Sequence, residues 1–140
     1  MREIKFRGKR IDNGEWVYGS YIRKLFYTGE TFNGFSENYN EDSPKDVIIA
    51  EEGIAYEVVP ETVGQYTGLH DKNGVEIYEG DYLGVNEEYT RIKDVYVYWD
   101  EEWNCWKIYI NGGNIHTLNS HSMEYLMPTV IGNIHEEEKK

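Results

Sequence analysis

Apolar and polar residues alternate along the chain in short segments, a period of two that is typical of strands with one buried face. The alternation begins at Ile4–Arg7 and is strongest in Ile92–Trp99, where Val95 and Val97 share one face. Further strands are predicted at residues 15–22, 46–50, 54–59, 63–69, 75–78, 82–85, 103–110, 115–118 and 129–134. Short strands separated by Gly-rich turns predict a mainly β protein with an antiparallel barrel-like or bent-sheet fold.

At most one or two short helices are expected beside these strands. The segment 122–127 predicts one, with Asn119 or Ser120 as its N-cap and Pro128 closing it. The order of turns and strands from Gly80 onward, with its Val-Tyr-Val-Tyr-Trp run, resembles that of small SH3-like barrels. A length of 140 residues favours one domain over 1–140. Within it, residues 27–45 are predicted to form a long polar loop or insertion, and residues 136–140 a charged tail.

The Gly-rich stretch at residues 64–85 is predicted to be a hairpin. Asp71–Gly74 has the composition of a type I turn followed by a glycine at positive φ. The Asp71 carboxylate can accept hydrogen bonds from the N–H groups of that turn. Asp81, which follows Gly80, is expected to hydrogen-bond a second backbone bend.

Charge is unevenly distributed in this acidic chain. Residues 1–24 carry seven Lys or Arg and three acids, a net charge of +4, whereas residues 25–140 carry a net charge of −16. The acidic body should repel duplex DNA and anionic membranes, while the basic start can contact an acidic surface, including that of a second copy. A solvated strand pair with mixed charges is the simpler alternative. A single cysteine, Cys105, and a start without an apolar signal segment favour a soluble protein of a reducing cytoplasm.

Motifs for chemistry are weak. The glycines of the central stretch lie between predicted strands and lack a Walker lysine, which argues against a phosphate cradle. The histidines lack zinc-ligand spacing, so no metal, cofactor or catalytic residue is predicted, and we do not expect an enzyme. Aromatic and basic residues near the start can form a base-stacking face, or the aromatics can fill the core, which we favour. The residues concerned are Lys5, Phe6, Arg7, Trp16, Tyr18 and Tyr21.

Three motifs, IKFRGK, VGQYTGLHDKNGVEIYEGD and VIGNIHE, resemble the YopX family. This resemblance covers nearly the whole chain and implies a phage- or prophage-derived protein in the cytoplasm of a bacterial host. It supplies no catalytic residue to transfer. The residues that match are mostly turn formers and strand residues, which suggests a structural role: Gly64, Gln65, Tyr66, Thr67, Gly68, Asp71, Asn73, Gly74, Gly80 and Asp81.

Two functional classes follow. The first is an accessory module that binds a phage or host protein or assembles with itself as a homo-oligomer. The alternative is a nucleic-acid-binding protein that acts through the basic N-terminal hairpin, although duplex DNA is not an expected partner. The candidate interaction residues in either case are Arg2, Lys5, Arg7, Arg10 and Trp16.

Overall fold

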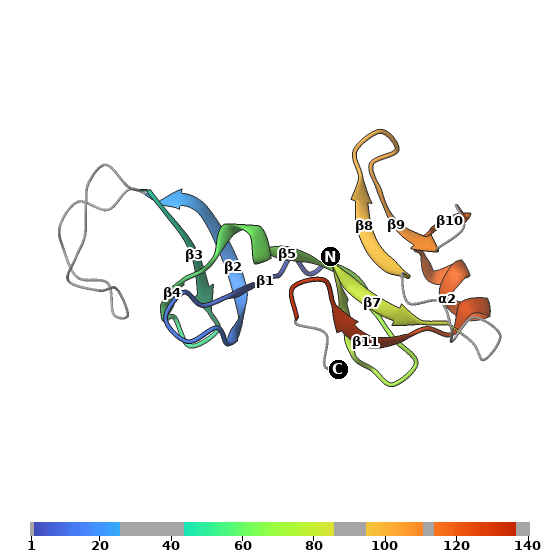
Figure 1. The fold of residues 1–140 in the computed structure, drawn as a ribbon, viewed down its shortest axis with the longest axis horizontal. Coiled ribbons are helices and arrows are strands. Elements are labelled where there is room, and N and C mark those ends of the chain that lie inside the picture. The colour runs from blue at the N-terminus through green and yellow to red at the C-terminus, as the bar shows by residue number, and fades with distance from the viewer. Residues whose placement is uncertain (1, 26–43, 86–94, 111–113, 137–140) are drawn as a thin grey trace. The chain divides into compact units, whose positions relative to one another are not determined.

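The computed structural model describes residues 2–25, 44–85, 95–110 and 114–136. Contacts group the chain into two compact units, Met1–Gln65 and Tyr66–Lys140, and each is described by itself (Figure 1). Strand β5 (Gly64–His70) contributes to both, because its first residues pair with β1 and its later residues pair with β6. The single-domain expectation stays a prediction.

The N-terminal unit is an antiparallel sheet with the strand order β4-β3-β2-β1-β5. The predicted turn closes its first hairpin, where Gly14 adopts φ +72° and Asn13 accepts a hydrogen bond from the Glu15 N–H at 2.9 Å. Pro60 begins a 3-10 turn, which ends the preceding run as predicted. The elements are β1 (Phe6–Lys9), β2 (Trp16–Leu25), β3 (Lys45–Ala50), β4 (Ala55–Glu57) and η1 (Pro60–Thr62).

One face of this sheet forms a small core. A Cβ added at Gly8 would lie 3.1 Å from both Ile48 and Val58, so the backbone of β1 lies directly on the core side chains. Side chains alternate across a strand, and Arg7 and Lys9 therefore leave β1 on the other face. The buried core residues are Val17, Ile48, Ala50 and Val58.

The C-terminal unit contains a five-stranded antiparallel sheet with the order β10-β9-β8-β7-β11, together with the hairpin of β5 and β6. Its elements are β6 (Glu76–Tyr78), β7 (Asp81–Gly84), β8 (Tyr96–Asp100), β9 (Cys105–Ile110), β10 (Asn114–Thr117), α2 (Ser120–Leu126) and β11 (Thr129–Asn133). Val95 and Val97 are buried on one face, as their alternation predicted. The core includes Ile77, Leu83, Val85, Val95, Val97, Trp106, Ile108, Leu118 and Leu126.

Helix α2 is fixed by a capping box. The Asn119 side chain accepts from the Ser122 N–H at 2.9 Å, and the Ser122 hydroxyl accepts from the Asn119 N–H at 2.9 Å. The helix begins at Ser120, two residues before the predicted start, because this cap lies at Asn119. Met127 ends it in the left-handed conformation at φ +43°.

The prediction of a mainly β, bent-sheet fold with at most one or two short helices is confirmed. Within the described ranges neither sheet closes into a barrel. Many of the predicted strand boundaries differ from the observed ones by one to three residues, and two of these corrections change how a residue is assigned. Lys45, assigned to the loop, is the first residue of β3, and Trp103 lies in a turn because the Asp100 carboxylate accepts from its N–H at 3.0 Å. The remainder of the predicted loop up to residue 43 lies outside the described residues, as do residues 137–140 of the tail.

Candidate functional site

Two basic side chains of β1 lie against one tryptophan of β2. The register pairs Arg7 with Tyr18 and Lys9 with Trp16. The guanidinium carbon of Arg7 lies 4.7 Å from the centre of the Trp16 ring, and the Lys9 Nζ lies 5.5 Å from it. Arg7 is only 6% exposed. Arg7, which was predicted to interact, and Lys9, which was not, therefore stabilise the sheet through cation–π contacts, and Arg7 offers little charge to a ligand.

The predicted base-stacking face does not form as a whole. Phe6 and Tyr21 pack against the core, with ring centres 5.5 Å apart, as the core-filling alternative holds. Trp16 and Tyr18 lie on the opposite face, and Tyr18 is 45% exposed. The period of two separates these aromatics because odd and even positions of a strand face opposite sides.

The residues before β1 are more accessible. Arg2 and Ile4 are both exposed, Ile4 to 63%. The Lys5 Nζ forms an ion pair with Glu3 at 3.4 Å. Among the predicted interaction residues, Arg2 is therefore the basic side chain with the most open surroundings.

Arg10 forms a small charged network with residues from two hairpins. Its Nε and Nη2 donate to the two carboxylate oxygens of Asp12 at 2.9 and 2.5 Å, and its guanidinium carbon lies 4.5 Å from the centre of the Tyr56 ring. The hydrogen bond to Asp12 raises the pKa of Arg10 and lowers that of Asp12. Burial, together with the hydroxyl's hydrogen bond to Glu52 at 3.2 Å, raises the pKa of Tyr56. The ring therefore stays neutral beneath a fixed guanidinium.

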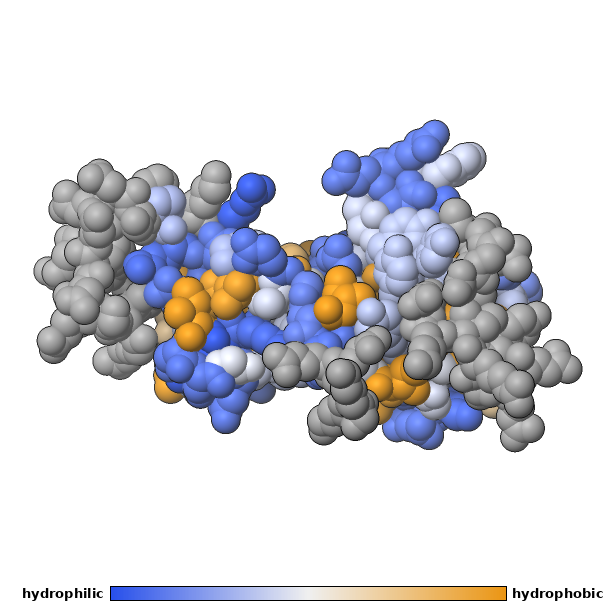
Figure 2. All heavy atoms as spheres, viewed as in Figure 1, coloured by the Kyte–Doolittle hydropathy of each residue, from blue (hydrophilic) through white to orange (hydrophobic). Residues whose placement is uncertain are grey.

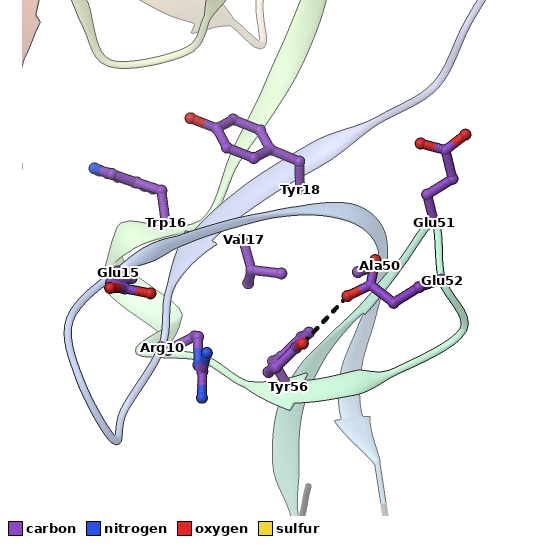
Figure 3. Close-up of a pocket in the computed structure, with 9 residues that line it drawn as sticks. All are labelled: Arg10, Glu15, Trp16, Val17, Tyr18, Ala50, Glu51, Glu52 and Tyr56. Carbon is purple, nitrogen blue, oxygen red and sulfur yellow. Dashed lines mark hydrogen bonds between the residues drawn. The ribbon is translucent and has the colours of Figure 1, made fainter. Parts of the chain in front are cut away.

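A pocket of about 310 Å³ adjoins this network, and we call it the Tyr56 pocket. It lies where the β1–β2 hairpin meets the β3–β4 hairpin, and its lining residues are Arg10, Glu15, Trp16, Val17, Tyr18, Ala50, Glu51, Glu52 and Tyr56. Figure 3 shows Val17 and Tyr56 on the same side of β2, whereas Trp16 and Tyr18 leave it on the other side. The floor is thus apolar and aromatic.

The rim of the Tyr56 pocket is acidic. Glu15, Glu51 and Glu52 are all exposed and line its edge. Figure 3 shows Glu52 directed toward Tyr56, with the hydrogen bond between them drawn. Arg10 is the basic residue that lines the pocket, and its charge is paired with Asp12. The three rim glutamates therefore leave the pocket entrance with a net negative charge. An apolar floor below a negative rim suits a side chain with an aliphatic stem and a positive head.

In the C-terminal unit, Asp71 acts as a clamp between distant strands. Its Oδ1 accepts from the N–H groups of Asn73 and Val75 at 2.8 and 2.9 Å, and its Oδ2 accepts from the Val130 N–H at 2.9 Å. Burial alone would raise the pKa of Asp71, but these backbone donors outweigh it and hold that pKa below its ordinary value. Gly74 adopts φ +82° in the same turn.

The other matched residues also take part in strands and bends. Gly64 and Gln65 pair with β1, and Gly68 adopts φ +87°. The Thr67 hydroxyl donates to the Ile77 carbonyl at 2.8 Å. Tyr66 is buried, and its hydroxyl lies 3.2 Å from Nδ1 of His70.

Asp81 holds a second bend, as expected from the sequence. Its Oδ2 accepts from the Tyr78 N–H at 2.7 Å, and Gly80 beside it adopts φ +87°. Each contact described for Asp71 and Asp81 is directed at the protein's own backbone. A role in architecture therefore accounts for these carboxylates.

Other kinds of site receive less support. Among the described residues, no three His, Cys, Asp or Glu side chains are grouped so as to hold a metal ion. In that part of the chain, no helix is both long and apolar enough to cross a membrane. Figure 2 shows the hydrophobic residues of the visible face as small separate patches on a mainly hydrophilic surface. The Tyr56 pocket is thus the strongest candidate among the described residues.

The described units define a mainly β protein built from two antiparallel sheets, with an aromatic, acid-rimmed pocket in its N-terminal unit. The chain belongs to the YopX family, since the family model described as YopX protein matches residues 5–139. This confirms the resemblance found in the sequence. A comparison with curated proteins gives no match. Membership fits a phage-type protein and by itself assigns no ligand or reaction.

Sequence reasoning missed most of the pocket. It named Arg10, Trp16 and Tyr18 as candidates. Tyr56 and Glu52 come from the β3–β4 hairpin, which was read only as a strand pair. The spacing Glu52–Tyr56 carries no recognisable motif. The two hairpins meet because β2 pairs with β3, and such long-range pairing leaves no local signal.

Proposed function

We propose that the protein is an accessory binding module, phage- or prophage-derived and acting in the cytoplasm of a bacterial host, that recognises a protein through the Tyr56 pocket. The observation that supports this is the combination of an apolar, aromatic floor with three exposed rim carboxylates in one pocket. A volume of about 310 Å³ is at the lower end of ligand sites and suits one long side chain.

The chemistry of the pocket favours a basic side chain of the partner. The stem of an arginine or lysine can pack on Val17 and Tyr56, while its charged head meets Glu52 at the rim. Arginine fits better than lysine, since its planar guanidinium stacks on aromatic rings and bonds carboxylates with two donors. Arg10 already makes both kinds of contact within the chain.

Binding is a better proposal than catalysis for this site. A carboxyl group that acts as a general acid needs burial to raise its pKa, and the rim glutamates are exposed. Duplex DNA is a poor candidate, because Arg7 is buried, Arg10 is paired with Asp12, and the chain carries a net charge of −12.

The test is a titration of the full chain with acetyl-Ala-Arg-Ala-amide, followed by backbone amide chemical shifts. We expect shifts at Val17, Ala50 and Tyr56 that weaken at high salt. The same tripeptide with citrulline in place of arginine keeps the shape without the charge, and it should shift these signals far less.

A matched pair of variants makes this test specific. Glu52→Gln removes one of the three rim charges and keeps an oxygen acceptor for the Tyr56 hydroxyl, so it should weaken binding without unfolding the pocket. Glu61→Gln makes the same change at an exposed residue of η1 that does not line the pocket, and it should bind as the wild type does. Equal shifts with arginine and citrulline, or equal loss in both variants, would refute the proposal.

A further inference from the structure

We infer that the occupant of the Tyr56 pocket is Arg2 of a second copy of the chain, so that two copies exchange their N-terminal segments. This inference rests on the proposed function and names the partner of the same site. Residues 1–24 carry +4 and residues 25–140 carry −16, and two copies thus offer each other surfaces of opposite charge.

Among the four basic residues predicted to interact, the structure favours Arg2. Arg7 is 6% exposed beneath Trp16, and Arg10 is part of the pocket that would receive the guest. Lys5 is half-buried and paired with Glu3. Arg2 is exposed and precedes β1, which begins at Phe6, so a short stretch outside the sheet presents it.

The surroundings of Arg2 suit insertion into a partner. Ile4, two residues along, is 63% exposed and therefore has apolar surface to bury. An arginine head in the pocket would meet Glu52 and Glu15 at the rim, with its stem against Val17. Ile4 would follow it to the edge and lose contact with water. Each inserted segment thus supplies a charged anchor and an apolar neighbour.

Exchange between two identical copies is reciprocal. In a two-fold arrangement each copy gives one Arg2 and receives one, so both pockets are filled and the assembly closes as a dimer. The dimer should weaken with salt, because both contacts pair exposed charges.

A charge exchange between two variants tests this arrangement. Arg2→Glu and Glu52→Lys should each raise the dimer dissociation constant at least tenfold, as measured by sedimentation at several protein concentrations. Mixed in equal amounts, the two variants should recover dimers of near wild-type affinity. In the mixed dimer one contact joins Glu at position 2 to Lys at position 52, and the other contact is native.

The controls carry the same charge changes elsewhere in the N-terminal unit. Arg23→Glu and Glu61→Lys alter exposed residues outside the pocket and should leave the dimer unchanged. A wild-type chain that is monomeric at every concentration would overturn the inference, as would a mixture that stays monomeric or insertion of Arg2 into its own pocket. Because an inserted Arg2 would exclude the arginine tripeptide, the titration is repeated on Arg2→Glu, in which the pocket is open. Tripeptide binding to that variant without a wild-type dimer overturns the inference alone, and absence of tripeptide binding to that variant refutes the proposed function.

Discussion

The carboxylate of Asp71 should contribute more to stability than any other single side chain of its hairpin. Asp71→Asn keeps an oxygen that can accept from Asn73 and Val75, but it turns an amide donor toward the Val130 N–H. Hydrogen bonds to a charged group contribute about 1.5–3 kcal/mol each, and a buried donor left unpaired costs a further amount of about 1–3 kcal/mol. We therefore expect a loss of about 3 kcal/mol in the free energy of unfolding.

Two measurements check this expectation. Urea denaturation followed by tryptophan fluorescence gives the change in stability, and amide hydrogen exchange reports the Val130 N–H directly. The depressed pKa of Asp71 sets the pH dependence. A lowered folded-state pKa stabilises the fold above the unfolded value of 3.8, and this contribution is lost as pH falls below it through the folded pKa. The difference in the free energy of unfolding between the wild type and Asp71→Asn should therefore become smaller in acid.

A neighbouring substitution serves as the control. Asn73 is exposed, and its bond to Asp71 is made by its backbone N–H, so Asn73→Ala should change stability by less than about 0.5 kcal/mol. The reasoning fails if Asp71→Asn costs no more than Asn73→Ala. It also fails if exchange at Val130 is unchanged, since that would mean that the clamp to β11 is not made in solution.

Three further outcomes follow from the structure. Gly19→Ala should lower the free energy of unfolding by more than about 3 kcal/mol, because its Cβ would lie 2.0 Å from a carbonyl oxygen of β3. A Cβ at Gly74 meets no atom within 4 Å, so Gly74→Ala should lower it by only about 1 kcal/mol, owing to the positive φ. Thermal melts that rank the two variants the other way would contradict this. Burial and the hydrogen bond to Asp46 raise the pKa of Tyr21 to about 12, so wild-type stability should fall between pH 10 and 12. Tyr21→Phe should be less stable by about 1 kcal/mol at pH 7 and should show a smaller fall in alkaline melts, and an equal fall would contradict this assignment. Asn119→Ala should lower the free energy of unfolding by about 1 kcal/mol and increase hydrogen exchange in the first turn of α2. Unchanged exchange there would mean that the Asn119 cap does not stabilise the helix.

Local patterns in the sequence predicted most of the strands and turns. Alternation located β8, and the Asp-Lys-Asn-Gly composition located the turn that Gly74 completes at φ +82°. Asp81 was expected at a backbone bend, and it accepts from the N–H of Tyr78 three residues away. Such features depend on residues close together in the chain, where sterics and hydrogen bonding leave few choices.

Contacts between distant residues could not be predicted in the same way. The third bond of Asp71 reaches Val130, 59 residues away, and no local pattern specifies it. The burial of Arg7 beneath Trp16 was also missed. Arginine is usually exposed in folded proteins, but the pairing of β1 with β2 places this arginine against the Trp16 ring. The Tyr56 pocket needs two hairpins joined by the pairing of Gly19 with Ala50.

The pairing of β7 with β11 has a consequence for the synthesis of the chain on the ribosome. Gly84 of β7 and Thr129 of β11 are 45 residues apart, so at about 5–20 residues per second the partner strand emerges roughly 2–9 seconds later. During that interval one edge of β7 has donors and acceptors without their native partner. Nascent chains that stall before residue 129 emerges present this open edge to one another, and stalling at that stage should therefore favour aggregation over delayed folding.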